Sequence, residues 1–274
     1  MRHFPLRIVR GLVAAVALSL VAAACGDDAG DTETGATTTP PESTSTAPTS
    51  TVTTTTAAPP TPASTPGPVP VPDAALPGEA FIAAPAEGRP VAVAGVRHDD
   101  VLNVRAIPGT DGEILAELAP TSNDSVATGR ARLLPSSIWW EITTADGTLG
   151  WISSRFTAQI GPTTDITAAV IADLGTTPEA ETIAELGRLV AEAVDSDPDI
   201  PTDIVMSVDA DETGDLAEVT YDVIGLGDDA VRGIRVHVFG TPSDSGAGFS
   251  LKTIEATDLC DPVRGPTEPG GICA

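Results

Sequence analysis

The sequence is poor in basic and aromatic side chains. Lys and Arg number 14 against 39 Asp and Glu, so the formal net charge is −25, and Phe, Trp and Tyr together make up only 3% of the chain. The negative electrostatic potential of such a chain repels nucleic acid and anionic lipid headgroups. The composition therefore excludes nucleic-acid binding and a body that lies flat on a membrane, but it does not specify a partner.

Histidines in metal-binding or catalytic spacing are absent as well. Only His98 and His237 lie beyond the first few residues, and neither belongs to an HxH or HxxxH pattern. No Ser or Cys stands with a His and a carboxylate in a known catalytic motif. We therefore predict that the protein is not an enzyme and holds no cofactor or metal. An enzyme whose catalytic residues come from distant segments remains as a third interpretation.

The N-terminus has the pattern of an export signal. Three arginines within the first ten residues precede an apolar segment from 11 to 21, and three alanines then lead to Cys25. The apolar segment is too short to span a membrane. The pattern resembles a bacterial lipoprotein signal over residues 1–24, although Ala22 stands where that family more often has Leu. The resemblance implies lipid attachment at Cys25 and an extracytoplasmic, membrane-anchored location facing the cell wall, with an ordinary secretory signal as the alternative.

Removal of this leader would leave 11 basic and 39 acidic side chains, a net charge of −28. Residues 25–78 that follow are dominated by Thr, Pro, Ser and Ala, with very few large apolar side chains. Such a segment has no core to offset the entropy of ordering. We predict a disordered stalk that holds the following domains away from the membrane.

Residues 88–160 have the alternating pattern of β-strands separated by turns. The clearest segments are Leu102-Asn103-Val104-Arg105, Pro108-Gly109-Thr110, Trp140-Glu141-Ile142, and Gly150-Trp151-Ile152 followed by Phe156. These segments and their spacing resemble a bacterial SH3 domain. The resemblance implies a small SH3-like β-barrel that binds peptidoglycan or wall peptides, or that accompanies wall enzymes.

The departure from that family is the stretch from Asn123 to Ser137, which predicts a lengthened loop bordering the ligand groove. Trp139 and Trp140 are adjacent, so on a strand they point to opposite faces. Trp140 matches a structural position of the family. Trp139 is then either a groove contact for a glycan or peptide, or a cover for the end of the barrel.

Residues 164–274 predict an α+β domain, with one main helix on an antiparallel sheet. Thr176 and Glu179 have capping-box spacing, and Pro178 suits a first turn. Apolar residues at helical spacing then continue to about Asp195, at Ile183, Leu186, Leu189, Val190, Ala193 and Val194. Four strand-like runs follow, at 204–208, 216–224, 231–239 and 249–256. The segment 165–174 is either another helix or a linker strand.

Cys260 and Cys273 enclose a tail with little apolar content. In an exported protein this pair predicts a disulfide that closes the tail. The acidic run from Asp209 to Asp215 resembles a calcium loop, but its strand-like flanks favour a hairpin turn. Gly225 to Asp229 lacks the third glycine and following helix of a phosphate loop, so it also predicts a turn.

Together these patterns predict a multidomain, β-rich protein: a signal peptide, a stalk, a small SH3-like barrel and a disulfide-closed α+β domain. The leading functional interpretation is a cell-envelope lipoprotein that binds cell-wall components without catalysis. The alternative is a structural or interaction subunit that docks an envelope protein through its C-terminal domain.

Overall fold

The computed structural model of the chain describes residues 70–195, 199–244 and 246–274. The predicted signal peptide, Cys25 and the stalk up to residue 69 lie outside the described residues. Among the residues that are described, no helix is long and apolar enough to cross a membrane.

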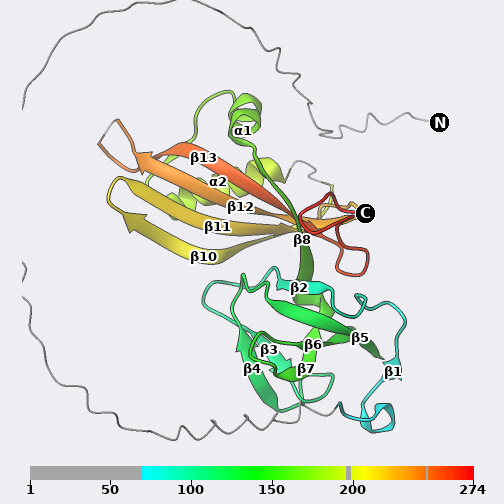
Figure 1. The fold of residues 1–274 in the computed structure, drawn as a ribbon. Helices are drawn as coiled ribbons and strands as arrows, with labels where there is room; N and C mark the ends of the chain where they lie inside the picture. Colours follow the sequence, from blue (N-terminus) through cyan, green and yellow to red (C-terminus); the bar gives the residue numbers. More distant parts are fainter. Residues whose placement is uncertain (1–69, 196–198, 245) are drawn as a thin grey trace, which may run out of the picture. The chain divides into compact units, whose positions relative to one another are not determined.

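The described part of the chain is β-rich, as predicted, with thirteen strands and two α-helices (Figure 1). The strands are β1 Glu79–Ala80, β2 Pro90–Val93, β3 Leu102–Arg105, β4 Ile114–Leu118, β5 Ser125–Leu134, β6 Ser137–Thr143, β7 Leu149–Ser153, β8 Thr157–Asp165, β9 Glu179–Ala180, β10 Asp203–Thr213, β11 Leu216–Ile224, β12 Val231–Pro242 and β13 Phe249–Cys260. The α-helices are α1 Thr167–Leu174 and α2 Ile183–Val194; the 3-10 turns are η1 Asp73–Ala75 and η2 Ser154–Phe156.

The strands are joined edge to edge in the order β10-β11-β12-β13-β8-β2-β5-β6-β7-β3-β4, with β1 on β5 and β9 on β13. Strand β8 is the link between the two sets, because it pairs with β2 through Thr157 and Ala158 and with β13 through residues 159–165. The predicted boundary between a domain ending at 160 and one starting at 164 therefore falls inside a continuous strand, where the chain has no linker.

Strands β2 to β7 enclose a small apolar core. Leu102 and Val104 of β3 share the buried face, as their alternation predicts. They pack with Val93, Ile142 and Ile152. Arg105 and Asn103 point the other way and are half-buried.

The prediction of a long loop from Asn123 to Ser137 is wrong, because most of this stretch is strand β5. Strand β5 forms a hairpin with β6, and Pro135 and Ser136 make the turn between them. The buried residues of β5 are small or polar, including Ser125 and Ala127. Their low hydrophobicity conceals the period-two pattern by which a half-buried strand is normally recognised.

Residues 70–83, here called the strap, contact the N-terminal strands at a few positions, so the last part of the predicted stalk, residues 70–78, lies against the folded strands. Leu76 is buried against Trp139 and Trp151, and Val71 packs beside it. The guanidinium of Arg132 donates to the backbone carbonyls of Leu76, Pro77 and Gly78. These partners lie more than fifty residues away in sequence, so composition alone could not reveal the packing.

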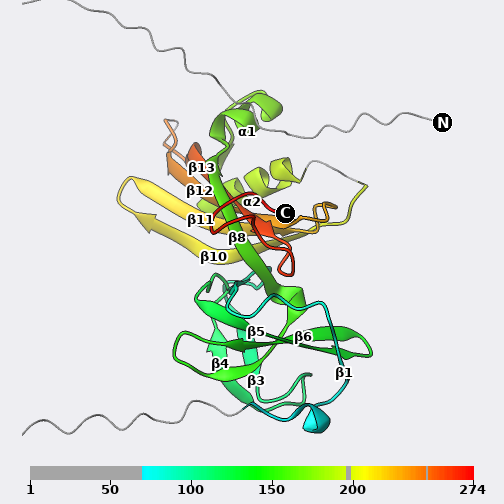
Figure 2. The ribbon, with the colours of Figure 1, turned by 45° about the vertical axis from the view of Figure 1, so that its right-hand side comes forward.

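Helix α2 covers one face of the sheet made by β10 to β13 (Figure 2). Val219, Tyr221 and Val223 of β11 share that face, and Val236 and Val238 of β12 continue it. The antiparallel register between the strands is continuous from Ala217–Gly240 to Ile224–Gly233.

The start of α2 differs from the prediction. The capping box is formed by Thr182 and Glu185, whose side chains reciprocally bond the backbone N–H groups, and not by Thr176 and Glu179. The two Thr–Glu pairs have the same spacing, so spacing alone does not distinguish them. Glu179 of the predicted pair belongs instead to β9, which pairs with β13. Leu189, predicted on the apolar face, is 37% exposed. The open alternative at 165–174 is resolved as helix α1, preceded by the end of β8.

The disulfide prediction is confirmed, because the sulfur atoms of Cys260 and Cys273 are bonded and their Cα atoms lie 5.1 Å apart. The enclosed loop is also held from the N-terminal strands. Gln159 Nε2 donates to the carbonyl of Pro262 at 2.7 Å, and Arg89 donates to the carbonyl of Arg264 at 3.2 Å.

Candidate functional site

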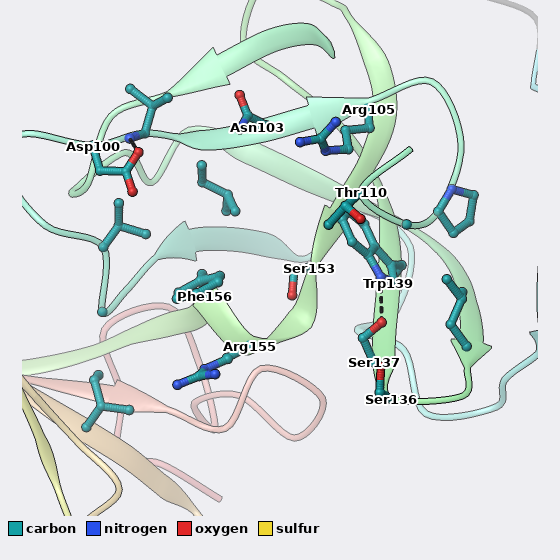
Figure 3. A pocket seen from close by; sticks show the side chains of 18 of the residues that line it. Asp100, Asn103, Arg105, Thr110, Ser136, Ser137, Trp139, Ser153, Arg155 and Phe156 are labelled. Atoms are coloured by element: carbon teal, nitrogen blue, oxygen red, sulfur yellow. Dashed lines mark hydrogen bonds between the residues drawn. The ribbon is translucent and has the colours of Figure 1, made fainter. Parts of the chain in front are cut away.

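A groove of about 1150 Å³ lies among the described residues. It is bordered by β3, β6, β7 with η2, the loops before β3 and after it, and the start of β10. In the close view, Trp139, Ser153 and Phe156 follow one another along it, and Asn103 and Arg105 of β3 lie opposite (Figure 3). Its walls thus combine aromatic surface with hydroxyl and amide groups.

Charged side chains of both signs line this groove, with one more arginine than aspartate. Four arginines line it, at positions 97, 105, 155 and 232, together with three aspartates, at 100, 111 and 203. Arg97 is already paired with Asp99 at 2.9 Å, and Arg105 donates to the carbonyl of Gly112 at 2.8 Å. Arg155 is less closely paired than Arg97, and Arg232 has a nitrogen without a hydrogen-bond partner among the described residues.

The side chain of Arg155 is well exposed, and its guanidinium carbon lies 5.6 Å from the centre of the Phe156 ring. Its acidic neighbour is Asp203, whose carboxylate is 3.7 Å away and equally exposed. A screened pair of this kind contributes little to stability, so the guanidinium is available to another anion.

Arg232 is half-buried and lies next to Arg155. It donates to the carbonyls of Ser154 and Arg155, while its Nε, which is out of contact with solvent, has no hydrogen-bond partner among the described residues. Burial lowers the pKa of Arg232; Asp261 opposes this effect, and the like charge of Arg155 adds to it. Two positive charges therefore lie next to each other at this end of the groove, with Asp203 and Asp261 as their acidic neighbours.

Trp139 lines the groove, but it is not an exposed contact. Its side chain is packed with Leu76 and Trp151, only 5% of the residue is exposed, and its Nε1 donates to Ser137 Oγ at 2.9 Å. Of the two interpretations of Trp139, burial favours the structural one, since the strap covers most of the ring. Trp140, on the opposite face, is buried too and donates to the carbonyl of Ala83.

The other candidate residues do not join this groove. His98 Nδ1 lies 3.7 Å from Asp209, and His237 Nε2 lies 3.3 Å from Glu218 on the half-exposed outer side of the sheet. The run from Asp209 continues strand β10 to Thr213 and then turns into β11, so the hairpin interpretation is correct. Gly225 and Gly227 likewise occupy the turn between β11 and β12. Within the described ranges, no group of three or more metal-ligating side chains is assembled.

The sequence did not single out the arginines of the groove. Arg105 belongs to the strand motif Leu102–Arg105, which predicts a strand and not a binding residue. Arg155 and Arg232 are separated by 77 residues, so their spacing gives no motif. Only the pairing of β8 with both β2 and β13 brings these segments together. A local signal existed only in Arg155-Phe156, where a cation adjoins an aromatic residue.

No protein-family model matches the chain, and no significant match is found among curated proteins or solved structures.

Proposed function

We propose that this protein is a lipid-anchored lipoprotein of the cell envelope whose N-terminal strands form an SH3-like barrel that binds cell-wall peptides without catalysing a reaction. The motif residues support the proposal, since Leu102–Arg105 forms β3, and the tryptophan segments form the paired strands β6 and β7. The groove is the observation that carries it.

The chemistry of the groove suits a short peptide. Phe156 offers apolar surface, while Asn103, Thr110 and Ser153 offer donors and acceptors for amide groups. Several side chains of a peptide would fit in a groove of about 1150 Å³. The open side of the groove leaves room for a ligand that is part of a larger polymer.

The net charge shapes this binding. A mature chain of charge −28 repels anionic wall polymers, while the arginines of the groove attract carboxylates locally. Binding to the intact wall should therefore be weak, and weakest at low salt when anionic polymers are present, because salt screens the long-range repulsion.

Co-sedimentation of the full chain with purified peptidoglycan tests the proposal. Asn103→Tyr would fill the groove from the solvent-facing side of β3 and is expected to reduce sedimentation at least about fivefold. Ala169→Tyr, at an exposed position of α1 outside the groove, is the matched control and should sediment like the parent. Absence of parent sedimentation at any salt concentration would favour the docking-subunit interpretation instead.

Anchoring is tested separately. Cys25→Ser removes the sulfur to which lipid would be attached, so the variant should move from the membrane fraction to the medium. Cell fractionation followed by immunoblotting measures this distribution. Unchanged membrane partitioning of the variant would refute lipid anchoring at Cys25.

A further inference from the structure

We propose that the groove recognises a free carboxylate at the end of its peptide ligand, and that Arg155 is the residue that contacts it. This inference rests on the proposed peptide-binding function and narrows it to peptides with an unblocked C-terminus. The guanidinium of arginine presents a planar fork of N–H donors that matches the two oxygens of a carboxylate.

Arg155 meets the requirements of such a contact. Its stem belongs to η2, and the Phe156 ring at 5.6 Å restricts where the guanidinium lies. Its exposed pairing with Asp203, at 3.7 Å, is longer than a hydrogen bond. An incoming carboxylate could therefore take over the fork of Arg155, and Asp203 would return to water with little loss.

Arg232 lies next to Arg155 and also favours an anion at this place. Its half-buried guanidinium is held by the carbonyls of Ser154 and Arg155, which are dipoles and not full charges. Asp261 compensates part of its charge, but the adjacent positive charge of Arg155 remains unfavourable to it. An anion bound at Arg155 would relieve this repulsion, so Arg232 acts as a positioning residue that increases the local attraction.

The surroundings favour one carboxylate over a phosphate. Asp100 and Asp203 also line the groove, and each would repel a doubly charged phosphate more strongly than a singly charged carboxylate. The ring of Phe156 further suits a ligand whose anionic group is joined to small apolar side chains.

The test is an NMR titration of the full chain, kept in detergent, with two synthetic peptides. The first is diacetyl-Lys-D-Ala-D-Ala with a free carboxylate, and the second is the same peptide with a C-terminal carboxamide. The amide should bind the parent about tenfold more weakly than the acid. Arg155→Gln should weaken binding of the acid about tenfold and leave the amide unchanged. Arg188→Gln, on the exposed side of α2 beside Glu192, is the matched control and should bind both peptides like the parent.

The outcomes separate this inference from the function on which it rests. Equal affinity for the two peptides, or no effect of Arg155→Gln, would overturn the inference and leave peptide binding intact. Sedimentation with peptidoglycan without binding of either peptide would also overturn it, while the proposed function would stand. Failure of both assays would overturn both. Inorganic phosphate is the third probe, and an Arg155-dependent affinity for phosphate above that for the acid peptide would refute the preference for a carboxylate.

Discussion

At the scale of single residues, Gly187 decides how closely α2 approaches the sheet. A Cβ atom at this position would lie 2.4 Å from Val219 Cγ1 and 2.8 Å from the ring of Tyr221. The hydroxyl of Tyr221 also donates to the carbonyl of Ala184, one turn earlier in the helix. The absence of a side chain at Gly187 therefore lets α2 seat on β11 with its apolar face fully covered.

Gly187→Ala should destabilise the protein by about 1–3 kcal/mol through overpacking, even though Ala favours a helix by about 1 kcal/mol over Gly. Urea denaturation followed by circular dichroism measures the change in the free energy of unfolding. Leu189→Ala, at the exposed neighbouring position, should have a smaller effect. A Gly187→Ala variant more stable than the parent would contradict the close approach.

Asp258 of β13 is a half-buried acid, and the protonation of its side chain makes the stability of the protein depend on pH. Burial raises the pKa of its carboxyl group above the usual value of an aspartate. A raised folded-state pKa means that the protonated group favours the folded state, so its contribution is complete below the unfolded-state pKa and is lost as pH rises through the folded-state pKa.

Asp258→Asn should therefore stabilise the protein at pH 7, by less than about 1 kcal/mol, and the difference should vanish under acidic conditions. Thermal unfolding of parent and variant at a series of pH values measures this effect. A variant that is less stable than the parent at pH 7 would show that the charged form is the favoured one.

At the scale of elements, the strap joins the N-terminal strands through its backbone as much as through its side chains. Its short strand β1 pairs with β5, and Arg130 donates to the carbonyl of Val71 at 2.9 Å and to Asp73 at 2.7 Å. Arg130 in turn is paired with the buried Glu141. The apolar contribution comes mainly from Leu76 over the two tryptophans.

Loosening the strap should expose Trp139. Leu76→Ala is expected to destabilise the protein by about 2–3 kcal/mol, and to increase acrylamide quenching of tryptophan fluorescence in the folded state. Ile82→Ala is the matched control, because Ile82 lies in the same segment but is fully exposed, and it should resemble the parent. Equal quenching in Leu76→Ala and the parent would indicate that the strap does not protect the ring.

At the scale of the whole described molecule, one buried ion pair connects the two sets of strands. Asp222 is fully buried and binds Arg235 through both oxygens, at 2.7 and 2.9 Å. It also accepts from the backbone N–H of Gly95, while Arg235 donates to the carbonyls of Val93 and Pro120. All of these contacts with the N-terminal strands are made by Asp222 of β11 and Arg235 of β12, so they depend on the ion pair between these two residues.

The two sets of strands should therefore unfold together. Asp222→Asn leaves Arg235 buried beside a neutral side chain, and it should destabilise the protein by about 3–5 kcal/mol. Asp215→Asn, in the exposed turn between β10 and β11, is the matched control and should change stability little.

The chain supplies separate probes for this test. Its three tryptophans all lie before β8, whereas the two α-helices of the described residues lie after it, so tryptophan fluorescence reports the N-terminal strands and the helical signal in circular dichroism reports the C-terminal part. Both signals should shift to lower urea by the same amount in Asp222→Asn. A fluorescence transition that does not move would mean that the N-terminal strands unfold independently.

Local patterns were sufficient where each side chain's environment follows from its near neighbours. Alternation placed Leu102 and Val104 on one face of a strand, and helical spacing placed Leu186 and Val190 on the buried side of α2. The cysteine pair in an apolar-poor tail was enough to predict its disulfide. In these cases the periodicity of the backbone converts sequence spacing directly into a shared face.

What the sequence by itself determined is thus the β-rich class, the main buried faces and the closed tail. Only the tertiary structure decided which of two identical capping patterns starts α2, that Ser125 to Leu134 is a strand, and that the strap covers Trp139. It also brought Arg155 and Arg232 together in one groove. The physical reason is that each of these outcomes depends on contacts between residues far apart in the chain, and neither spacing nor composition records such contacts.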